Sequence, residues 1–171
     1  MNIHKMKMIV GMAACVLCAT SFAQLGEIGE EDSSSKADAR VRRALENADV
    51  KYRIDKDGDY RVQWTLDEGR THVVFINSNT TKLGSMELRE VWAIAFVADE
   101  VSANNMRALL ELNAKYKVGA WRMYKGRSGY QVSFCVTVSA NCAGQALRTF
   151  SQVVASTADE IEKTVTKADK F

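Results

Sequence analysis

Proline is absent from the 171 residues of this chain, and histidine occurs only twice. The lack of proline argues against several domains joined by stiff linkers, and it suits continuous helices and strands joined by glycine turns. A chain of this length favours one domain with a single hydrophobic core.

The shortage of histidine also limits the chemistry that the chain can perform. Beyond the N-terminal segment the only histidine is His72, and neither Cys135 nor Cys142 has a histidine at a spacing typical of a nucleophile and its base. No glycine-rich phosphate loop follows a strand, and no ligand cluster has zinc-site spacing. We therefore expect no catalytic residue, no cofactor site and no metal site, and we do not expect an enzyme.

Neither sign of charge is in excess. The chain has 23 Lys and Arg residues against 21 Asp and Glu residues. Lys5 and Lys7 belong to the N-terminal segment, and without them the two signs balance. This balance argues against a nucleic-acid partner and against a polybasic membrane anchor, because both require a basic surplus.

The first 23 residues have the pattern of a signal peptide. Lys5 and Lys7 precede an apolar run, Met8 to Ala19, and Ser21 and Ala23 supply small residues at a cleavage site. The rival interpretation, a membrane span, needs ~20 apolar residues. We expect cleavage after Ala23, a periplasmic protein and no membrane span after cleavage. Residues 24–35 are acidic and serine-rich and predict a flexible linker, and residues 36–171 predict the folded domain.

Cysteine usage leaves one question open. Cys15 and Cys18 fall in the signal peptide, where the residues before them match a lipoprotein site poorly. Cys135 and Cys142 remain in the domain, and they are compatible with a disulfide in an oxidising compartment or with two small buried thiols.

Residues 101–139 organise the domain, because their hydrophobic period changes from that of a helix to that of a strand. Ser102 is a suitable N-cap, and apolar residues follow at helical spacing up to a stop at Gly119. Ala120–Tyr124 and Tyr130–Ser139 then alternate as two strands of a hairpin.

The remaining segments complete an α+β fold, in which three helices pack on an antiparallel sheet in the order α-β-β-β-(β)-α-β-β-α. A first helix is expected over about residues 36–48, a meander of strands over 52–78, a long strand over Met86–Ala98 and a final helix from about Cys142 to Lys167. Asp55, Asp57 and Asp59 alternate as in a calcium loop, but Gly58 stands too early and Leu66 replaces the bidentate glutamate. We therefore interpret this segment as a hairpin turn.

The long strand is apolar on both faces. One face carries Leu88, Trp92, Ile94 and Phe96, and the second carries Val91, Ala93, Ala95 and Val97. Such a strand is central and covered twice, or it exposes a patch to a partner. We take Val91, Ala93, Ala95 and Val97 as the candidate protein interface, and we expect at least two of Trp64, Trp92 and Trp121 to lie in the core.

Three stretches carry a resemblance to a known family: Val50–Val62 (VKYRIDKDGDYRV), Val91–Ala95 (VWAIA), and Leu109–Tyr124 followed by Phe134. With the order of elements, the chain resembles the YbjN-like family, also labelled bacterial sensory transduction regulators, which shares the type III secretion chaperone-like fold. The resemblance implies an α+β sandwich with an antiparallel sheet, frequent dimerisation and no established enzyme activity. This chain differs from the better known members of the family in carrying an export signal.

Together these observations predict an exported, non-enzymatic module that binds a protein or peptide client, or a second copy of itself. The alternative is a periplasmic sensor of a small molecule or of envelope stress, with its ligand between the helix Ser102–Val118 and the sheet. The sequence names neither the client nor the ligand.

Overall fold

The computed structural model describes residues 36–171. The predicted signal peptide (residues 1–23) and linker (residues 24–35) lie outside the described residues. The elements, in order, are α1 (Ala39–Asn47), β1 (Arg53–Ile54), β2 (Tyr60–Thr65), the short 3₁₀ helix η2 (Asp67–Gly69), β3 (Thr71–Ile76), β4 (Thr81–Leu83), β5 (Met86–Ala98), α2 (Ala103–Asn113), β6 (Ala120–Gly126), β7 (Gly129–Ser139) and α3 (Gly144–Thr166). The predicted α+β class is confirmed.

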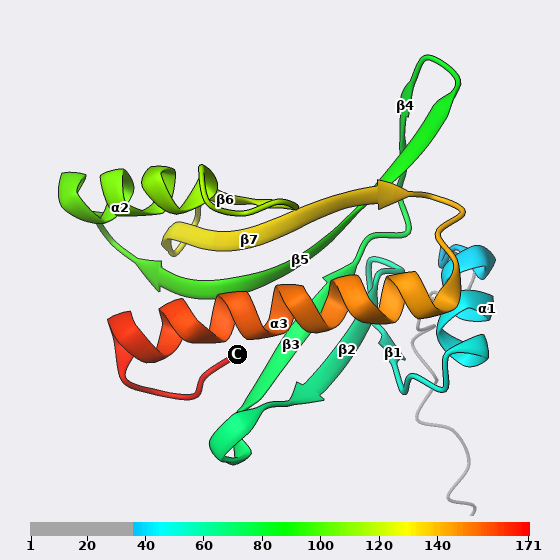
Figure 1. Cartoon of the computed structure of the whole chain (residues 1–171), viewed down its shortest axis with the longest axis horizontal. Helices are drawn as coiled ribbons and strands as arrows, with labels where there is room; N and C mark the ends of the chain where they lie inside the picture. The colour runs from blue at the N-terminus through cyan, green and yellow to red at the C-terminus, as the bar shows by residue number, and fades with distance from the viewer. Residues whose placement is uncertain (1–35) are drawn as a thin grey trace, which may run out of the picture. The chain divides into compact units, whose positions relative to one another are not determined.

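All strand pairs of the described sheet are antiparallel, and the strand order is β1-β2-β3-β5-β7-β6, with β4 paired to β5 (Figure 1). β5 is the central strand, because it pairs with β3, β4 and β7. Of the two alternatives for this strand, a central position or a patch exposed to a partner, the structure shows the central position. Its register shifts between Ile94 and Phe96, which marks a β-bulge.

α3 covers one face of the sheet, α1 packs against α3, and α2 lies beside the edge strand β6 (Figure 1). α3 runs across β3, β5 and β7 and covers their buried side chains (Figure 1). It does so because small and apolar residues recur along one stripe of the helix, at Leu147, Ser151, Val154 and Ala158. Core residues of the sheet face this helix, among them Tyr60, Val74, Ile76, Val91, Ala93, Phe134 and Val136.

The opposite face of the sheet has no helix on it within residues 36–171, and we call it the open face. One residue from each of five strands marks it: Arg61, Phe75, Trp92, Ser133 and Arg122, which follow one another by register pairing or alternation. Trp92 is half-buried here, whereas Trp121 lies in the core and Trp64 packs against it. Trp121 is thus the one tryptophan in the core itself, and the prediction of at least two core tryptophans holds only if the partly buried Trp64 is counted with it.

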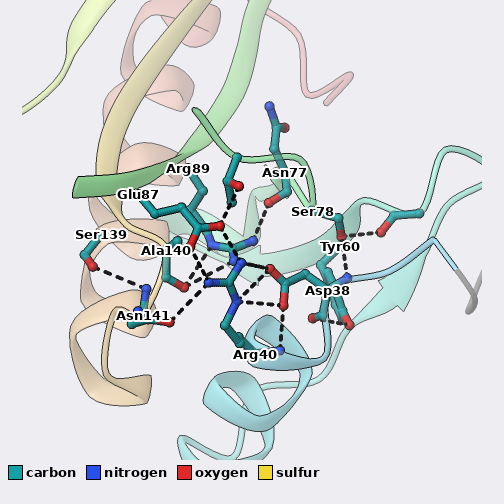
Figure 2. Close-up of polar contacts among 12 residues, drawn as sticks. Asp38, Arg40, Tyr60, Asn77, Ser78, Glu87, Arg89, Ser139, Ala140 and Asn141 are labelled. Carbon is teal, nitrogen blue, oxygen red and sulfur yellow. Dashed lines mark hydrogen bonds and ion pairs between the residues drawn. The ribbon is translucent and has the colours of Figure 1, made fainter. Parts of the chain in front are cut away.

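One buried guanidinium joins three segments that are distant in the sequence. Arg89 of β5 is 2% exposed, and each of its three nitrogen atoms donates a hydrogen bond. Nη1 donates to the carbonyl of Asn77 (2.6 Å), Nη2 to Asp38 Oδ2 (2.6 Å), and Nε and Nη2 to the carbonyl of Ala140 (3.3 and 3.2 Å) (Figure 2). Arg89 therefore fixes the start of α1 and the β7–α3 connection against the sheet.

Asp38 is the acidic centre of the same network. Its carboxylate caps α1 by accepting from the Arg40 amide (2.8 Å), and it also accepts from the Arg40 guanidinium (2.7 Å). Arg40 in turn donates to both oxygens of Glu87 (2.8 Å each), and Tyr60 donates its hydroxyl to the Asp38 carbonyl (3.0 Å) (Figure 2). The donors and acceptors satisfy one another, so this network is structural.

Two predicted helix boundaries are wrong. α2 ends at Asn113 and not just before Gly119, because the Asn113 side chain turns to bond the backbone of Trp121. Gly119 has φ +78° and lies against Phe134, and it immediately precedes β6 instead of capping the helix. α3 begins at Gly144 and not near Cys142, and its N-cap residue, Ala143, makes no side-chain cap.

Cys135 and Cys142 are free thiols, so the disulfide interpretation is not supported. Asp55 closes the turn that was compared with a calcium loop, since its Oδ1 accepts from the amides of Asp57 and Asp59 at 3.0 Å each. Within residues 36–171 no helix has the length and hydrophobicity required to cross a membrane.

The Asp38–Arg89 pair predicts a specific loss of stability. Burial alone would raise the pKa of Asp38, but hydrogen bonds from Arg40 and Arg89 outweigh it and hold the pKa well below its ordinary value of 3.8. We expect Asp38→Asn to lower the free energy of unfolding at pH 7 by about 3–5 kcal/mol, because it leaves Arg89 buried without its counter-charge. Urea unfolding followed by circular dichroism measures this change.

The same pair sets the sign of the pH dependence. A depressed carboxyl pKa stabilises the fold above the unfolded-state value and loses this contribution as pH falls through the folded-state value. The stability gap between the parent and Asp38→Asn should therefore be complete above about pH 5 and should narrow below about pH 4. A gap that stays constant down to pH 2 would contradict this assignment. Asp57→Asn, at an exposed turn position, is the matched control.

Candidate functional site

The four residues predicted as an interface do not share one surface. Three of them are 0% exposed and form part of the core under α3: Val91, Ala93 and Ala95. Val97 is 42% exposed, because the bulge between Ile94 and Phe96 reverses the alternation of β5. Val97 pairs with Gln131 and lies on the open face. The second apolar face is thus covered by the chain's own helix, and only Val97 remains accessible to a partner.

β6 is the terminal strand of the described sheet and has only β7 as a neighbour. The backbone groups on its outer side alternate with those that bond β7. Trp121 shows which residues point outward: its N–H donates to Asn113 Oδ1 (2.6 Å), and its carbonyl accepts from Asn113 Nδ2 (3.4 Å). By alternation, Met123 and Lys125 also direct their N–H and C=O groups outward.

The side-chain amide of Asn113 therefore occupies the place that a neighbouring strand would take at Trp121. It covers only this first position. Within residues 36–171 the outward backbone groups of Met123 and Lys125 have no hydrogen-bond partner. An edge strand with unpaired groups is a template for another strand.

Exposed apolar side chains surround this edge on the helix side. Met106 and Leu110 of α2 are 37% and 69% exposed, and Met123 of β6 is 44% exposed. They line a small pocket of about 170 Å³ together with Leu109 and Trp121. We call Met106, Leu110 and Met123 the α2–β6 patch. Methionine is unbranched and adaptable, so such a surface fits varied apolar groups.

A second apolar group lies on the open-face side of the same strand. Tyr124 is 69% exposed, and Val97 is 42% exposed. Both pair with Gln131 of β7, so the three side chains form one row across the sheet. β6 thus has exposed apolar residues on both faces and unpaired backbone groups between them.

Further along the open face the side chains hold one another in place. Phe75 and Trp92 stack with ring centroids 4.5 Å apart, and the Arg61 guanidinium lies 5.3 Å from the Phe75 ring centroid. Trp92 Nε1 donates to Asn77 Oδ1 (2.7 Å). The stacked pair gives this face a rigid, half-buried aromatic centre.

Cys135 is also on the open face, but it has no nucleophilic character. It pairs with Trp92 in the sheet and is 3% exposed. Burial raises the pKa of its thiol to about 11, and a nearby Glu90 charge acts in the same direction. The thiol is therefore protonated at neutral pH, and only a thiolate attacks.

A buried polar cluster joins β3 to α3. Arg70 Nε donates to Asp159 Oδ1 (2.7 Å), and Arg70 Nη2 donates to Glu162 Oε2 (3.3 Å). His72 lies beside them, with Nδ1 3.6 Å from Glu162 Oε2 and 3.9 Å from Asp159 Oδ1. In the described part of the chain, His72, Asp159 and Glu162 form the one group of side chains with the composition and spacing of a metal site.

The sequence analysis missed this cluster. Asp159 and Glu162 lie one turn apart on a long amphipathic helix, where acidic residues normally face solvent. A usable signal existed, because Glu162 continues the buried stripe of Val154 and Ala158 by one further turn. An acidic residue on the apolar stripe of a helix requires a partner in the core. The side-chain partner of Glu162 is Arg70, which is distant in the sequence.

Comparison with known proteins supports the fold. No protein-family model matches this chain, and no curated protein matches it significantly. Among solved structures, YbjN from E. coli, described as "a putative transcription regulator", aligns with a TM-score of 0.51 and 9% sequence identity. The alignment covers 75% of this chain and 90% of that chain. At this identity the likeness is one of fold, and the YbjN-like fold expected from the sequence is confirmed.

Proposed function

We propose that this YbjN-like chain is a non-enzymatic protein-binding module that takes up an extended segment of a client protein along β6. The observation that carries the proposal is the pair of outward-facing, unpaired backbone positions at Met123 and Lys125. Strand addition to a free sheet edge is a common mode of peptide recognition, in which backbone hydrogen bonds supply much of the affinity.

Specificity would come from the side chains on either side of the edge. Successive residues of an added strand point to opposite faces. One set would meet the α2–β6 patch of Met106, Leu110 and Met123, and the other would meet Tyr124 and Val97. The client is therefore an extended segment with apolar residues at alternating positions.

The α2–β6 pocket suits a client side chain better than a free metabolite. Its volume of about 170 Å³ is smaller than the ~300–1,000 Å³ typical of small-molecule sites. An apolar side chain such as leucine fits this scale. YbjN is described as a regulator, and we propose that this chain too regulates or chaperones another protein by binding it.

The central test replaces one outward N–H. Met123→Pro removes an amide that bonds nothing in the sheet, and proline is tolerated on an edge strand with its nitrogen outward. Peptides selected from a random 12-residue library on the parent protein should bind Met123→Pro roughly tenfold more weakly, the effect of about one backbone hydrogen bond. Isothermal titration calorimetry gives the two affinities.

Met123→Ile is the matched control, because it keeps both the amide and the apolar side chain, and it should bind the peptides as the parent does. Equal circular dichroism spectra establish that Met123→Pro is folded. Hydrogen exchange provides an independent check: peptide should slow the amides of Met123 and Lys125 and leave the already paired Arg122 and Tyr124 amides unchanged. Equal peptide affinity of the proline and isoleucine variants would refute strand addition at β6.

The same edge could pair with β6 of a second copy, in the two-fold arrangement common to homodimers. Sedimentation velocity of the parent and of Met123→Pro separates this occupant from a client. A parent dimer that the proline variant dissociates assigns the edge to self-association. A parent monomer that still binds the selected peptides assigns it to a client.

We also propose that the protein is exported to the periplasm and cleaved after Ala23. Expression of the full chain in a bacterial host should give a mature protein in the periplasmic fraction that begins at Gln24, as N-terminal sequencing reports. Ala23→Leu places a large residue at the cleavage position, so the uncleaved precursor should accumulate. A cytoplasmic protein that retains Met1 would contradict this proposal.

A further inference from the structure

His72 has a fixed tautomer. Its Nε2 lies 2.9 Å from the carbonyl oxygen of Ile94, and a carbonyl oxygen can only accept a hydrogen bond. Nε2 therefore carries a hydrogen atom. In the neutral ring with a hydrogen atom on Nε2, Nδ1 presents a bare lone pair. This Nδ1 has no hydrogen-bond donor among the described residues.

The Nδ1 lone pair points into a group of negative oxygen atoms. His72 and Glu162 are 0% exposed and Asp159 is 9% exposed. The nearest atoms to Nδ1 are Glu162 Oε2 (3.6 Å) and Asp159 Oδ1 (3.9 Å), which accept hydrogen bonds and donate none when ionised. Electron-rich atoms that face one another in a buried site repel unless a cation lies between them.

The charged groups around His72 have a net negative charge that a divalent cation could balance. Asp159, Glu162 and Asp169 all lie within 4 Å of one positive group, Arg70. Three carboxylates against one guanidinium leave a surplus of two negative charges. A doubly charged cation would neutralise the cluster.

We propose that His72 Nδ1, Asp159 and Glu162 bind a divalent transition-metal ion of the Zn²⁺ class. A mixed set of one imidazole and two carboxylates is typical of such ions. Metal–ligand bonds of ~2.0–2.2 Å place two tetrahedral ligands ~3.4 Å apart. The observed separations of 3.6 and 3.9 Å, with all three ligand atoms within 4.8 Å of one another, need only small movements to reach this geometry.

The neighbouring groups have the arrangement that supports a metal ligand. The Ile94 carbonyl orients the imidazole through Nε2, and Arg70 orients the two carboxylates. Such outer partners fix the tautomer and direction of ligands in known sites. A surface hollow of about 500 Å³ reaches Asp159 of the cluster, and its lining has four carboxylates (Asp67, Glu68, Asp159 and Glu160) against two cations (Arg70 and Lys163). Three protein ligands leave one coordination position for water or for a group of a partner.

The ion would hold β3 to the last turns of α3. The C-terminal residues already lie over this cluster, because the Lys170 amide donates to Glu162 Oε1 (2.7 Å) and the Val73 amide donates to the Phe171 carbonyl (3.2 Å). Metal binding at His72 therefore stabilises the same contact that anchors the tail. The proposal is independent of the function proposed for β6, which lies elsewhere in the fold.

The test measures zinc on the full chain after treatment with a chelator. ZnCl₂ titration by calorimetry, with metal content after dialysis by mass spectrometry, should give one tightly bound zinc per chain. At a hundredfold excess over Kd the melting temperature should rise by roughly 5–10 °C. Asp159→Asn and His72→Gln should each weaken binding at least tenfold. Glu111→Gln, which removes an exposed carboxylate of α2, is the control and should bind as the parent does.

A direct measurement covers the case in which a variant fails to fold. Nitrogen-15 spectra of the parent should show His72 as the Nε2–H tautomer, with a change at Nδ1 on addition of zinc. Three results would overturn the proposal: no zinc bound by the parent, zinc binding unchanged in folded Asp159→Asn, or a His72 ring protonated on both nitrogens at pH 7 and insensitive to zinc.

Discussion

The buried ion pair between Arg89 and Asp38 is the constraint on which the rest of the architecture depends. A guanidinium at 2% exposure is costly unless every nitrogen is bonded, and here a carboxylate and two backbone carbonyls surround it. These acceptors come from the start of α1, the end of β3 and the end of β7, segments that no local propensity brings together. The pair therefore makes the correct arrangement of α1 and α3 a condition for burying the charge at all.

α3 covers one face of the sheet and α2 lies beside β6, so the open face is available for interaction (Figure 1). Phe75 and Trp92 hold the centre of the open face by stacking, while β6 ends the sheet with its backbone only partly satisfied by Asn113. A single asparagine covers one position of the edge and leaves the next two outward positions to another chain. This partial cover distinguishes the edge from one that is fully protected and from one that would aggregate without restraint.

Much of the fold could be predicted because alternation in β2, β5 and β7 survives in the sequence. The sequence could not predict which face of β5 packs against α3, because both faces are apolar and the choice depends on long-range register. Regular alternation also predicts that Val97 and Val91 share a face, because the hydrophobic pattern does not reveal the bulge between them. The cluster of His72, Asp159 and Glu162 was missed for a similar reason, because the two acidic residues come together with His72 only when β3 lies under α3. The unpaired backbone groups at Met123 could not be predicted either, because they depend on which strand lies at the edge of the sheet.

The bulge in β5 has a consequence for how this protein can diversify. One extra residue near Ala95 separates the strand into an inner portion, whose spacing is locked to the packing of α3, and an outer portion that ends at Ala98. Beyond the bulge, substitutions at Val97 alter the molecule's exterior without touching its interior. Loss of that single residue would restore regular alternation, because Ile94, Phe96 and Val97 could keep their partners Ser133, Val132 and Gln131, with Phe96 still inward and Val97 still outward.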